Sequence, residues 1–259
     1  MNTTAPRKGA TRAADIPADV LDALSRGELP STTLVEGLAL DQARLLRTVF
    51  PHLSPQALAN TDAACQLGIL KRMAGIGAVL LEELGIDGIA QCQGHASDTV
   101  RGWACFMIGV RPDLDLPSRL AAIRPLANDA HFGVREWAWM AVRPHLAHDL
   151  DAAIAHLSTW TAEPSERLRR FASEALRPRG VWCAHIVMLK QQPERALPIL
   201  SQLRADSSVY VQDSVANWLN DAAKTQPDWV RDLCAQWQQD QPSIDATRRI
   251  CQRALRNLK

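Results

Sequence analysis

The stretch VREWAWMAVRP at residues 134–144 decides the fold, because copies of it recur at regular distances along the chain. VRGWA begins 34 residues earlier, at residue 100, and LRRFA begins 34 residues later, at residue 168. A weaker fourth copy, VQDSV, begins 43 residues further on, at residue 211. Helical repeats of this period are typical of an α-solenoid, in which pairs of helices stack on one another. The sequence therefore predicts an all-α protein built as an α-solenoid.

The remaining sequence also predicts helices. Alanine, leucine, arginine, glutamine and glutamate are abundant, and alternating runs of β-branched residues, which would indicate strands, are absent. Prolines mark the ends of the expected helices at intervals, so we expect roughly a dozen helices joined by short turns. We expect residues 1–14 to form a flexible N-terminal tail and residues 15–259 to form a single repeat domain.

Composition excludes several classes of protein. The chain has 259 residues, 47% of them hydrophobic, and a net charge of +1, which excludes an intrinsically disordered protein. It has no run of about 18 apolar residues and no apolar segment near its start, so we expect neither a membrane span nor a secretory signal. The six cysteines form no CxxC pair and do not cluster with the seven histidines at ligand spacing. We therefore expect reduced thiols and no zinc site.

Two stripes of side chains recur on the repeated helices. The first is apolar and predicts a buried face that includes Trp103, Trp137 and Phe171. The second stripe lies beside it and is polar, and stacking of the repeats is expected to bring its members to one surface. An ordinary solvated face with pairs inside each helix is the alternative. The charged members of the second stripe are Glu136, Arg143, Arg170, Glu174 and Arg177.

The charges are distributed unevenly along the chain. Residues 97–204 carry 14 basic and 11 acidic groups, whereas residues 1–96 carry 8 basic and 10 acidic groups. The basic residues between positions 165 and 179 are all arginines, whose planar guanidinium groups suit contacts with phosphate. The region with the repeats is thus the part of the chain most suited to bind a nucleic acid. We expect it to attract the nucleic acid at this region only and not over the whole surface of the protein.

Several of these strings resemble a known family. VREWAW at residues 134–139, RRFASEALRPRGVWC at residues 169–183 and SVANWLND at residues 214–221 are similar to the DNA alkylation repair glycosylases built from HEAT-like repeats. The AlkC branch of that superfamily is more similar than the AlkD branch. The resemblance extends from about residue 16 to residue 235. We expect no immunoglobulin-like domain of the kind that some relatives carry after the repeats.

The resemblance implies an enzyme of base excision repair. Such a glycosylase hydrolyses the N-glycosidic bond of cationic alkylated bases, such as 3-methyladenine and 3-methylcytosine, without a metal or a cofactor. The expected partner is double-stranded DNA that contains alkylated bases. We expect a monomer with no obligate protein partner and no membrane, in the cytoplasm with access to the bacterial nucleoid.

The resemblance also implies which residues form the site. A carboxylate near the sugar would stabilise the positive charge that develops as the base leaves, an aromatic face would contact the sugar or the lesion, and arginines would hold phosphates. The expected catalytic residues are Glu136, Glu174, Trp182 and Asp221. The expected DNA-binding residues are Arg135, Arg143, Arg169, Arg170, Arg177 and Arg179.

The fourth repeat departs from the family pattern. Gln212 and Asp213 stand where relatives usually have basic residues, and Trp218 stands where they often have asparagine. We interpret Gln212 and Asp213 as the loss of a phosphate contact, with drift on a solvated face as the alternative. Two other functions stay open: a non-catalytic relative that binds unusual DNA structures, and a scaffold that binds proteins.

Overall fold

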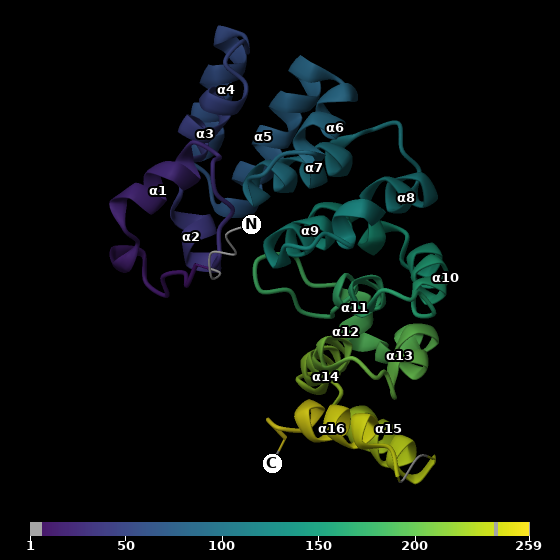
Figure 1. Cartoon of the computed structure of the whole chain (residues 1–259). Coiled ribbons are helices and arrows are strands. Elements are labelled where there is room, and N and C mark those ends of the chain that lie inside the picture. Colours follow the sequence, from purple (N-terminus) through teal and green to yellow (C-terminus); the bar gives the residue numbers. More distant parts are fainter. Residues whose placement is uncertain (1–6, 241–242, 259) are drawn as a thin grey trace. The chain divides into compact units, whose positions relative to one another are not determined.

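The computed structural model describes residues 7–240 and 243–258, and within this part of the chain it contains helices and no strand (Figure 1). The prediction of an all-α protein is confirmed. The described residues form sixteen α-helices and two short 3-10 helices, more than the dozen expected. The difference arises because turns and prolines divide several stretches into short helices, such as α12 (Val187–Gln191) and α13 (Leu197–Leu203).

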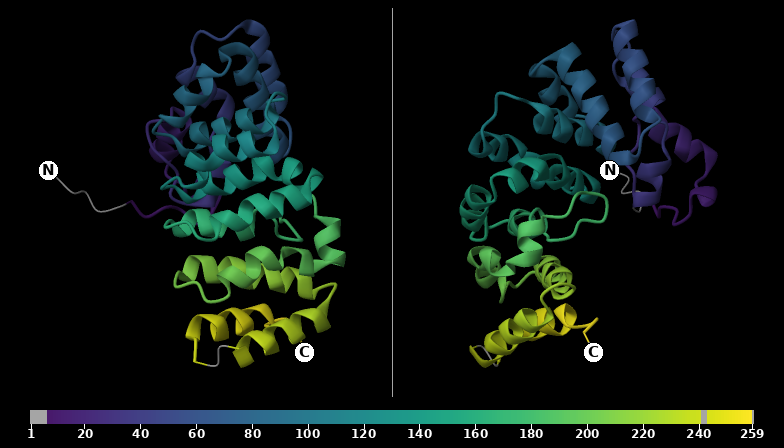
Figure 2. Two further views of the ribbon diagram at one scale, coloured as in Figure 1. Left: turned by 90° about the vertical axis from the view of Figure 1, so that its right-hand side faces the viewer. Right: turned by 180° about the vertical axis from the view of Figure 1, so that it is seen from behind.

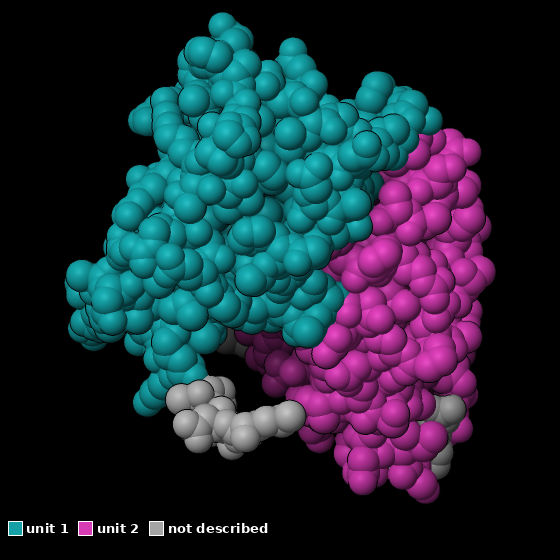
Figure 3. All heavy atoms as spheres, turned by 45° about the horizontal axis from the view of Figure 1, so that its top comes forward, with its two compact units in different colours: residues 1–113, 129–141 teal, residues 114–128, 142–259 magenta. Residues whose placement is uncertain are grey.

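The chain divides into two compact units, which Figure 3 distinguishes by colour. Unit 1 comprises residues 1–113 and 129–141, and unit 2 comprises residues 114–128 and 142–259. The chain passes from one unit to the other within α9 (Phe132–His148). The single domain expected over residues 15–259 stays a prediction.

Unit 1 contains the N-terminal helices and the first part of α9. Its best-packed pair is α5 and α7, where Gly77 allows close approach, because a Cβ atom there would lie 2.9 Å from the backbone nitrogen of Met107. The elements of unit 1 are η1 (Ala13–Asp15), α1 (Ala18–Ser25), α2 (Leu34–Ala39), α3 (Gln42–Val49), α4 (Pro55–Cys65), α5 (Ile69–Leu84), α6 (Asp87–Gln93) and α7 (Asp98–Val110).

Unit 2 consists of two rows of helices in successive layers (Figure 2). In one row α11 packs against α14 and α14 packs against α16, and in the other α8 packs against α10 and α10 against α13. The elements not yet bounded are α8 (Leu116–Ala127), α10 (Leu150–Trp160), α11 (Glu166–Glu174), η2 (Pro193–Ala196), α14 (Val209–Ala223), α15 (Pro227–Asp240) and α16 (Asp245–Ala254).

The apolar stripe of the repeats forms the core, as predicted. Trp103 is fully buried, and Trp137 and Phe171 are buried as well. Trp160 packs against Phe171 with a centroid distance of 5.1 Å in unit 2, and Phe106 packs against Trp137 at 6.0 Å in unit 1. None of the described helices is long and apolar enough to cross a membrane.

The described part of the predicted tail lies against α2. Both terminal nitrogens of Arg7 donate to the carboxylate of the buried Glu36, at 2.6 and 2.7 Å, and the backbone N–H of Ala10 donates to it at 3.1 Å. Arg7 is the main reason why the pKa of Glu36 is lowered to about 2, against the opposing effect of burial. Residues 1–6 of the expected tail lie outside the described residues, and the boundary at residue 14 stays a prediction.

Candidate active site

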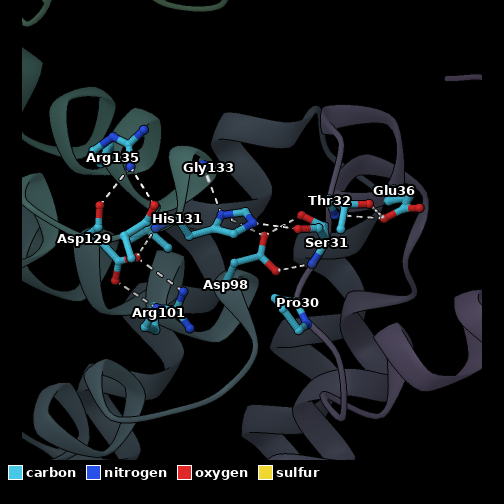
Figure 4. Close-up of polar contacts among 12 residues, drawn as sticks. Pro30, Ser31, Thr32, Glu36, Asp98, Arg101, Asp129, His131, Gly133 and Arg135 are labelled. Atoms are coloured by element: carbon cyan, nitrogen blue, oxygen red, sulfur yellow. Dashed lines mark hydrogen bonds and ion pairs between the residues drawn. The ribbon is translucent and has the colours of Figure 1, made fainter. Parts of the chain in front are cut away.

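The arginine in the second position of each repeat holds the turn before its own helix. Arg101, Arg135 and Arg169 each donate from Nη1 to two carbonyl groups, five and six residues earlier, at 2.8 or 2.9 Å. Arg101 also binds both oxygens of Asp129 (Figure 4), and Arg169 binds both oxygens of Asp206. The expectation that Arg135 and Arg169 stand open to DNA does not fit these contacts. The guanidinium of Arg135 holds the turn before its own helix, and that of Arg169 also binds Asp206 of the next repeat.

Gln212 occupies the same position in the fourth repeat and makes the equivalent contact. Its Nε2 donates to the carbonyl of Asp206, six residues earlier, at 2.8 Å. Asp213, next to it, accepts from Arg249 at 2.7 Å and lies 2.9 Å from Nε of Arg253, so it ties α14 to α16. The interpretation of this pair as a lost phosphate contact was therefore wrong: Gln212 keeps a structural contact of the repeat, and Asp213 is ion-paired within unit 2.

A serine, a histidine and an aspartate also meet in unit 1, but not in the order of a nucleophilic triad (Figure 4). The hydroxyl of Ser31 donates to Asp98 at 2.7 Å, and the backbone N–H of Ser31 donates to the same carboxylate at 2.7 Å. His131 contacts the carbonyl of Ser31 at 2.6 Å, not its hydroxyl. This arrangement anchors the segment around Ser31 to α7 and α9 and leaves no base to activate the serine.

A cluster of charged side chains in unit 2 contains most of the predicted site. At its centre is Glu174, at the end of α11, with a side chain only 5% exposed. Its Oε1 accepts from Arg177 at 2.9 Å, and its Oε2 accepts from the hydroxyl of Ser214 at 2.6 Å and lies 3.6 Å from Arg170. Ser214 belongs to α14, so the carboxylate is held between two neighbouring repeats.

Arg177 connects Glu174 to a second buried carboxylate, that of Asp221 on α14. Its Nε and Nη2 both donate to Oδ2 of Asp221, at 2.9 and 2.7 Å. Lys224 donates to the other carboxylate oxygen of Asp221 at 3.0 Å. Nε of Arg179 donates to the main-chain carbonyl of Asp221 at 3.3 Å. Two carboxylates and several cations thus lie close together, on α11, on α14 and on the residues that directly follow these helices.

The surroundings keep Glu174 ionised. Burial alone would raise its pKa, but Arg170, Arg177 and the Ser214 hydroxyl outweigh burial and lower the pKa below its ordinary value. Burial likewise acts to lower the pKa of Arg177, and the two carboxylates raise it above its ordinary value. A carboxylate of this kind supplies negative charge and not a proton, so it suits stabilisation of a cation and not general acid catalysis.

Aromatic side chains border the cluster. The guanidinium carbon of Arg170 lies 4.5 Å from the ring centroid of Tyr210, so the ring helps to orient this arginine. Trp218, which differs from the family pattern, is buried and donates to the carbonyl of Leu176 at 2.9 Å, so it has a structural contact in this chain.

The segment after α11 carries Trp182 on an exposed loop. We call residues 178–186 the Trp182 loop; its ends are joined by a hydrogen bond of 3.1 Å from the N–H of Ile186 to the carbonyl of Pro178. Val181 is 81% exposed and Trp182 is 38% exposed, which is unusual for large apolar side chains. The predicted catalytic tryptophan therefore does not belong to the core.

The structure corrects the predicted surface stripe in another place. Arg143 is only 2% exposed, and Trp139 and Met140 from the same stripe are buried. The guanidinium of Arg143 donates to the carbonyls of Ala175 and Arg177, at 2.7 and 2.6 Å. These three side chains of α9 are therefore buried, and Arg143 does not face a DNA-binding surface.

Not all predicted residues lie in one unit. Glu174, Asp221, Arg170, Arg177 and Arg179 belong to the cluster of unit 2. Glu136 and Arg135 belong to unit 1, and the carboxylate of Glu136 accepts from Nε1 of its neighbour Trp139 at 2.9 Å.

Three members of the cluster escaped the sequence prediction. Ser214 lies in the quoted motif SVANWLND, Tyr210 is the single tyrosine of the chain, and Lys224 follows Asp221 by one helical turn. Only the motif position of Ser214 offered a signal, because contacts between repeats depend on which helices pack together.

Several known proteins resemble this chain. The family described as DNA alkylation repair enzyme matches residues 129–248. The uncharacterized protein YhaZ of Bacillus subtilis (strain 168) is 41% identical over 124 residues, which are 48% of this chain and 34% of that protein. The chain thus spans about a third of this curated relative.

Solved structures resemble the whole fold. The alkylpurine DNA glycosylase AlkC of Pseudomonas fluorescens, solved with DNA that contains an abasic site analog, matches with a TM-score of 0.68 and 26% identity over 96% of this chain and 65% of its own. AlkD2 from Streptococcus mutans matches with a TM-score of 0.54 and 19% identity, over 83% of this chain and 97% of its own, which shows likeness of fold alone. The predicted resemblance to the HEAT-like repeat superfamily of AlkC and AlkD is confirmed by the family match and by the likeness to AlkC.

Proposed function

We propose that this protein is a monofunctional DNA glycosylase that hydrolyses the N-glycosidic bond of cationic alkylated bases, such as 3-methyladenine and 3-methylcytosine, in double-stranded DNA. The observation that carries the proposal is the cluster of Glu174, Arg177 and Asp221, which lies in the part of the chain that matches the DNA alkylation repair family. The solved AlkC, similar over nearly the whole chain, was bound to DNA.

The chemistry requires little from the protein beyond charge and position. When the C1′–N bond of a cationic alkylated base breaks, the electron pair stays on the base, which leaves neutral and needs no proton. The deoxyribose becomes cationic, and water then adds at C1′ and releases a proton to solvent. Glu174, which its surroundings keep ionised, favours this cation by its negative charge. Asp221 beside it is the second candidate for this role, and Glu136 stays a separate candidate.

The cations around the two carboxylates give the site a positive balance. Arg170, Arg177, Arg179 and Lys224 surround Glu174 and Asp221, so positive groups outnumber negative ones. We assign to these cationic side chains the contacts with the phosphates on either side of the lesion. We assign to Trp182 a contact with the sugar or the cationic base through its exposed face. In this proposal the protein acts as a monomer, in the compartment that holds the DNA, without a metal or a cofactor.

A scaffold that binds proteins is one alternative. The nearly neutral charge of the chain favours it, whereas the carboxylate of Asp213 is already paired with Arg249 and Arg253. The alternative of DNA binding without catalysis predicts salt-dependent retention on DNA and no release of base.

The test is incubation of the protein with DNA methylated at N3 of adenine and cytosine, at low salt, with chromatographic measurement of the released bases. We expect release well above that of a blank, and a strong loss of rate in Glu174→Gln. Glu166→Gln is the matched control, because Glu166 is an exposed glutamate on the same helix. No release by the wild-type protein would refute the proposal, and equal rates for Glu174→Gln and Glu166→Gln would refute the role of Glu174.

A further inference from the structure

One buried side chain holds both ends of the segment that carries Trp182. Arg143 donates from Nη1 to the carbonyl of Ala175 at 2.7 Å and from Nη2 to the carbonyl of Arg177 at 2.6 Å. Its Nε and Nη2 also donate to the carbonyl of Ala184, each at 3.3 Å. Ala175 and Arg177 precede the Trp182 loop and Ala184 lies near its end, so a single guanidinium links the two sides.

These acceptors explain why the residue is an arginine. Ala175 follows the last residue of α11, and carbonyl groups at the end of a helix have no partner within the helix. A cation is favourable there because it opposes the negative end of the helix dipole. The planar guanidinium carries five N–H groups in a fixed fork and reaches several carbonyls at once, whereas a lysine ammonium is a single compact centre.

The Trp182 loop is otherwise compact. Its base is closed by the hydrogen bond from Ile186 to Pro178, and Ile186 is buried. Within the loop the chain turns so tightly that a Cβ atom at Gly180 would collide with the Sγ atom of Cys183. The exposed Val181 and Trp182 lie between these two residues. The conformation that presents Trp182 therefore depends on the loop packing inside and on Arg143 beneath.

We propose that Arg143 is a positioning residue, which fixes the Trp182 loop and the backbone of Arg177. It thereby sets the place of Trp182 relative to Arg177, a member of the Glu174–Arg177–Asp221 cluster. This inference rests on the proposed glycosylase function for its catalytic consequence. Arg143 touches no substrate in this scheme, since its guanidinium is buried and occupied by main-chain carbonyls. Its contribution is the preorganisation of groups that do.

The first experiment replaces Arg143 by lysine and, separately, by glutamine, with Arg124→Lys as the matched control. Arg124 lies on α8 in the same unit and pairs with Glu163 at the surface, 2.7 Å apart. Each variant is labelled with 5-fluorotryptophan, and the 19F resonance of Trp182 is assigned by its absence in a Trp182→Phe protein. We expect a shifted or broadened Trp182 resonance in both Arg143 variants and an unchanged one in Arg124→Lys.

The kinetic readout separates positioning from binding. Because a misplacement of about 1 Å can cost on the order of a hundredfold in rate, we expect kcat on methylated DNA to fall about tenfold to a hundredfold in Arg143→Lys, with KM changed much less. The second experiment moves the loop without touching Arg143. Gly180→Ala should shift the Trp182 resonance and lower kcat, and Gly180→Ala combined with Cys183→Ala, which removes the colliding sulfur, should restore both.

Each outcome decides the matter. A folded Arg143→Lys with the wild-type Trp182 resonance and kcat would overturn the inference. Loss of the whole helical fold in both Arg143 variants would also overturn it, because the role would then extend beyond the loop. The 19F measurement needs no activity. If the Trp182 resonance shifts in the Arg143 variants but the wild-type protein releases no base, the glycosylase function is refuted and the positioning role of Arg143 is not. A failed rescue in the double variant would refute the role assigned to the loop conformation.

Discussion

The role of the repeated arginine can be tested with two arginines on one helix. Arg169 and Arg167 both lie on α11, two residues apart. Arg169 makes two bonds to Asp206, at 2.6 and 3.0 Å, and two to carbonyl groups, both at 2.9 Å. Arg167 donates to the carbonyl of Asn128 at 3.1 Å in an exposed position. We replace each by methionine, which keeps most of the side-chain length and removes the charge.

The expected difference follows from burial. The side chains of Arg169 and Asp206 are 16% and 6% exposed. Removing one partner of a buried pair costs about 3–5 kcal/mol, whereas exposed pairs contribute about 0–1 kcal/mol. Because Arg169 is slightly exposed, we expect Arg169→Met to lower the free energy of unfolding by about 3 kcal/mol. For a chain of this size that corresponds to a fall in melting temperature of roughly 6–12 °C. Arg167→Met should cost about 0.5 kcal/mol.

Two assays distinguish a structural arginine from a DNA-binding one. Circular dichroism gives the melting temperatures, and titration of duplex DNA at several salt concentrations gives the slope of log affinity against log salt. Loss of a phosphate contact would reduce that slope by about 0.9. We expect the slope of folded Arg169→Met to equal that of the wild type. A melting temperature within about 2 °C of wild type together with a reduced slope would refute the structural role of Arg169.

Three further outcomes are expected. Glu174→Gln should lower the rate of base release by about a hundredfold or more, while Asp221 keeps Arg177 paired; a smaller fall in single-turnover assays would contradict its role. Trp182→Ala should melt close to wild type and lose about tenfold in activity, because its ring is partly exposed; a large loss of melting temperature would show a core role instead. Because Arg7 and main-chain donors lower the pKa of Glu36 to about 2, the stability that its ionised form adds is present above pH 4.5 and lost as pH falls toward 2. The melting-temperature difference between wild type and Glu36→Gln should therefore narrow over that range.

The loop that bears Trp182 had a signal in the sequence. The first three copies of the repeat are 34 residues apart, whereas the distance from Leu168 to Val211 is 43 residues. The Trp182 loop, residues 178–186, lies inside this longer interval. A lengthened spacing between repeats thus indicated where the regular stack is interrupted, although it did not indicate that the inserted segment exposes a tryptophan.

The balanced charge of the C-terminal region gave no indication of the ion pairs that its carboxylates form. Residues 205–259 carry seven basic and seven acidic groups, which suggested a balanced surface. In the structure Asp206, Asp213 and Asp221 each bind an arginine that is distant in the sequence. A count of charges along the chain has no information about such pairs, because the partners are separated by 36 to 44 residues.

The sequence by itself determined the all-α fold, the repeat period and the burial of Trp103, Trp137 and Phe171, because the spacing of apolar residues along a helix is a local property. It also pointed to Glu174, Arg177 and Asp221 through their motifs. Only the tertiary structure decided which polar side chains stay exposed. The pattern of a single helix distinguishes only a buried face from an exposed one. In a stack of repeats, contacts with other helices can also bury side chains on the face that the pattern leaves exposed. Arg143, which the pattern assigned to an exposed stripe, and Arg169, which the resemblance assigned to DNA binding, instead bind carbonyl groups and a carboxylate. Trp182 stands at the surface because it lies on a loop outside the helices.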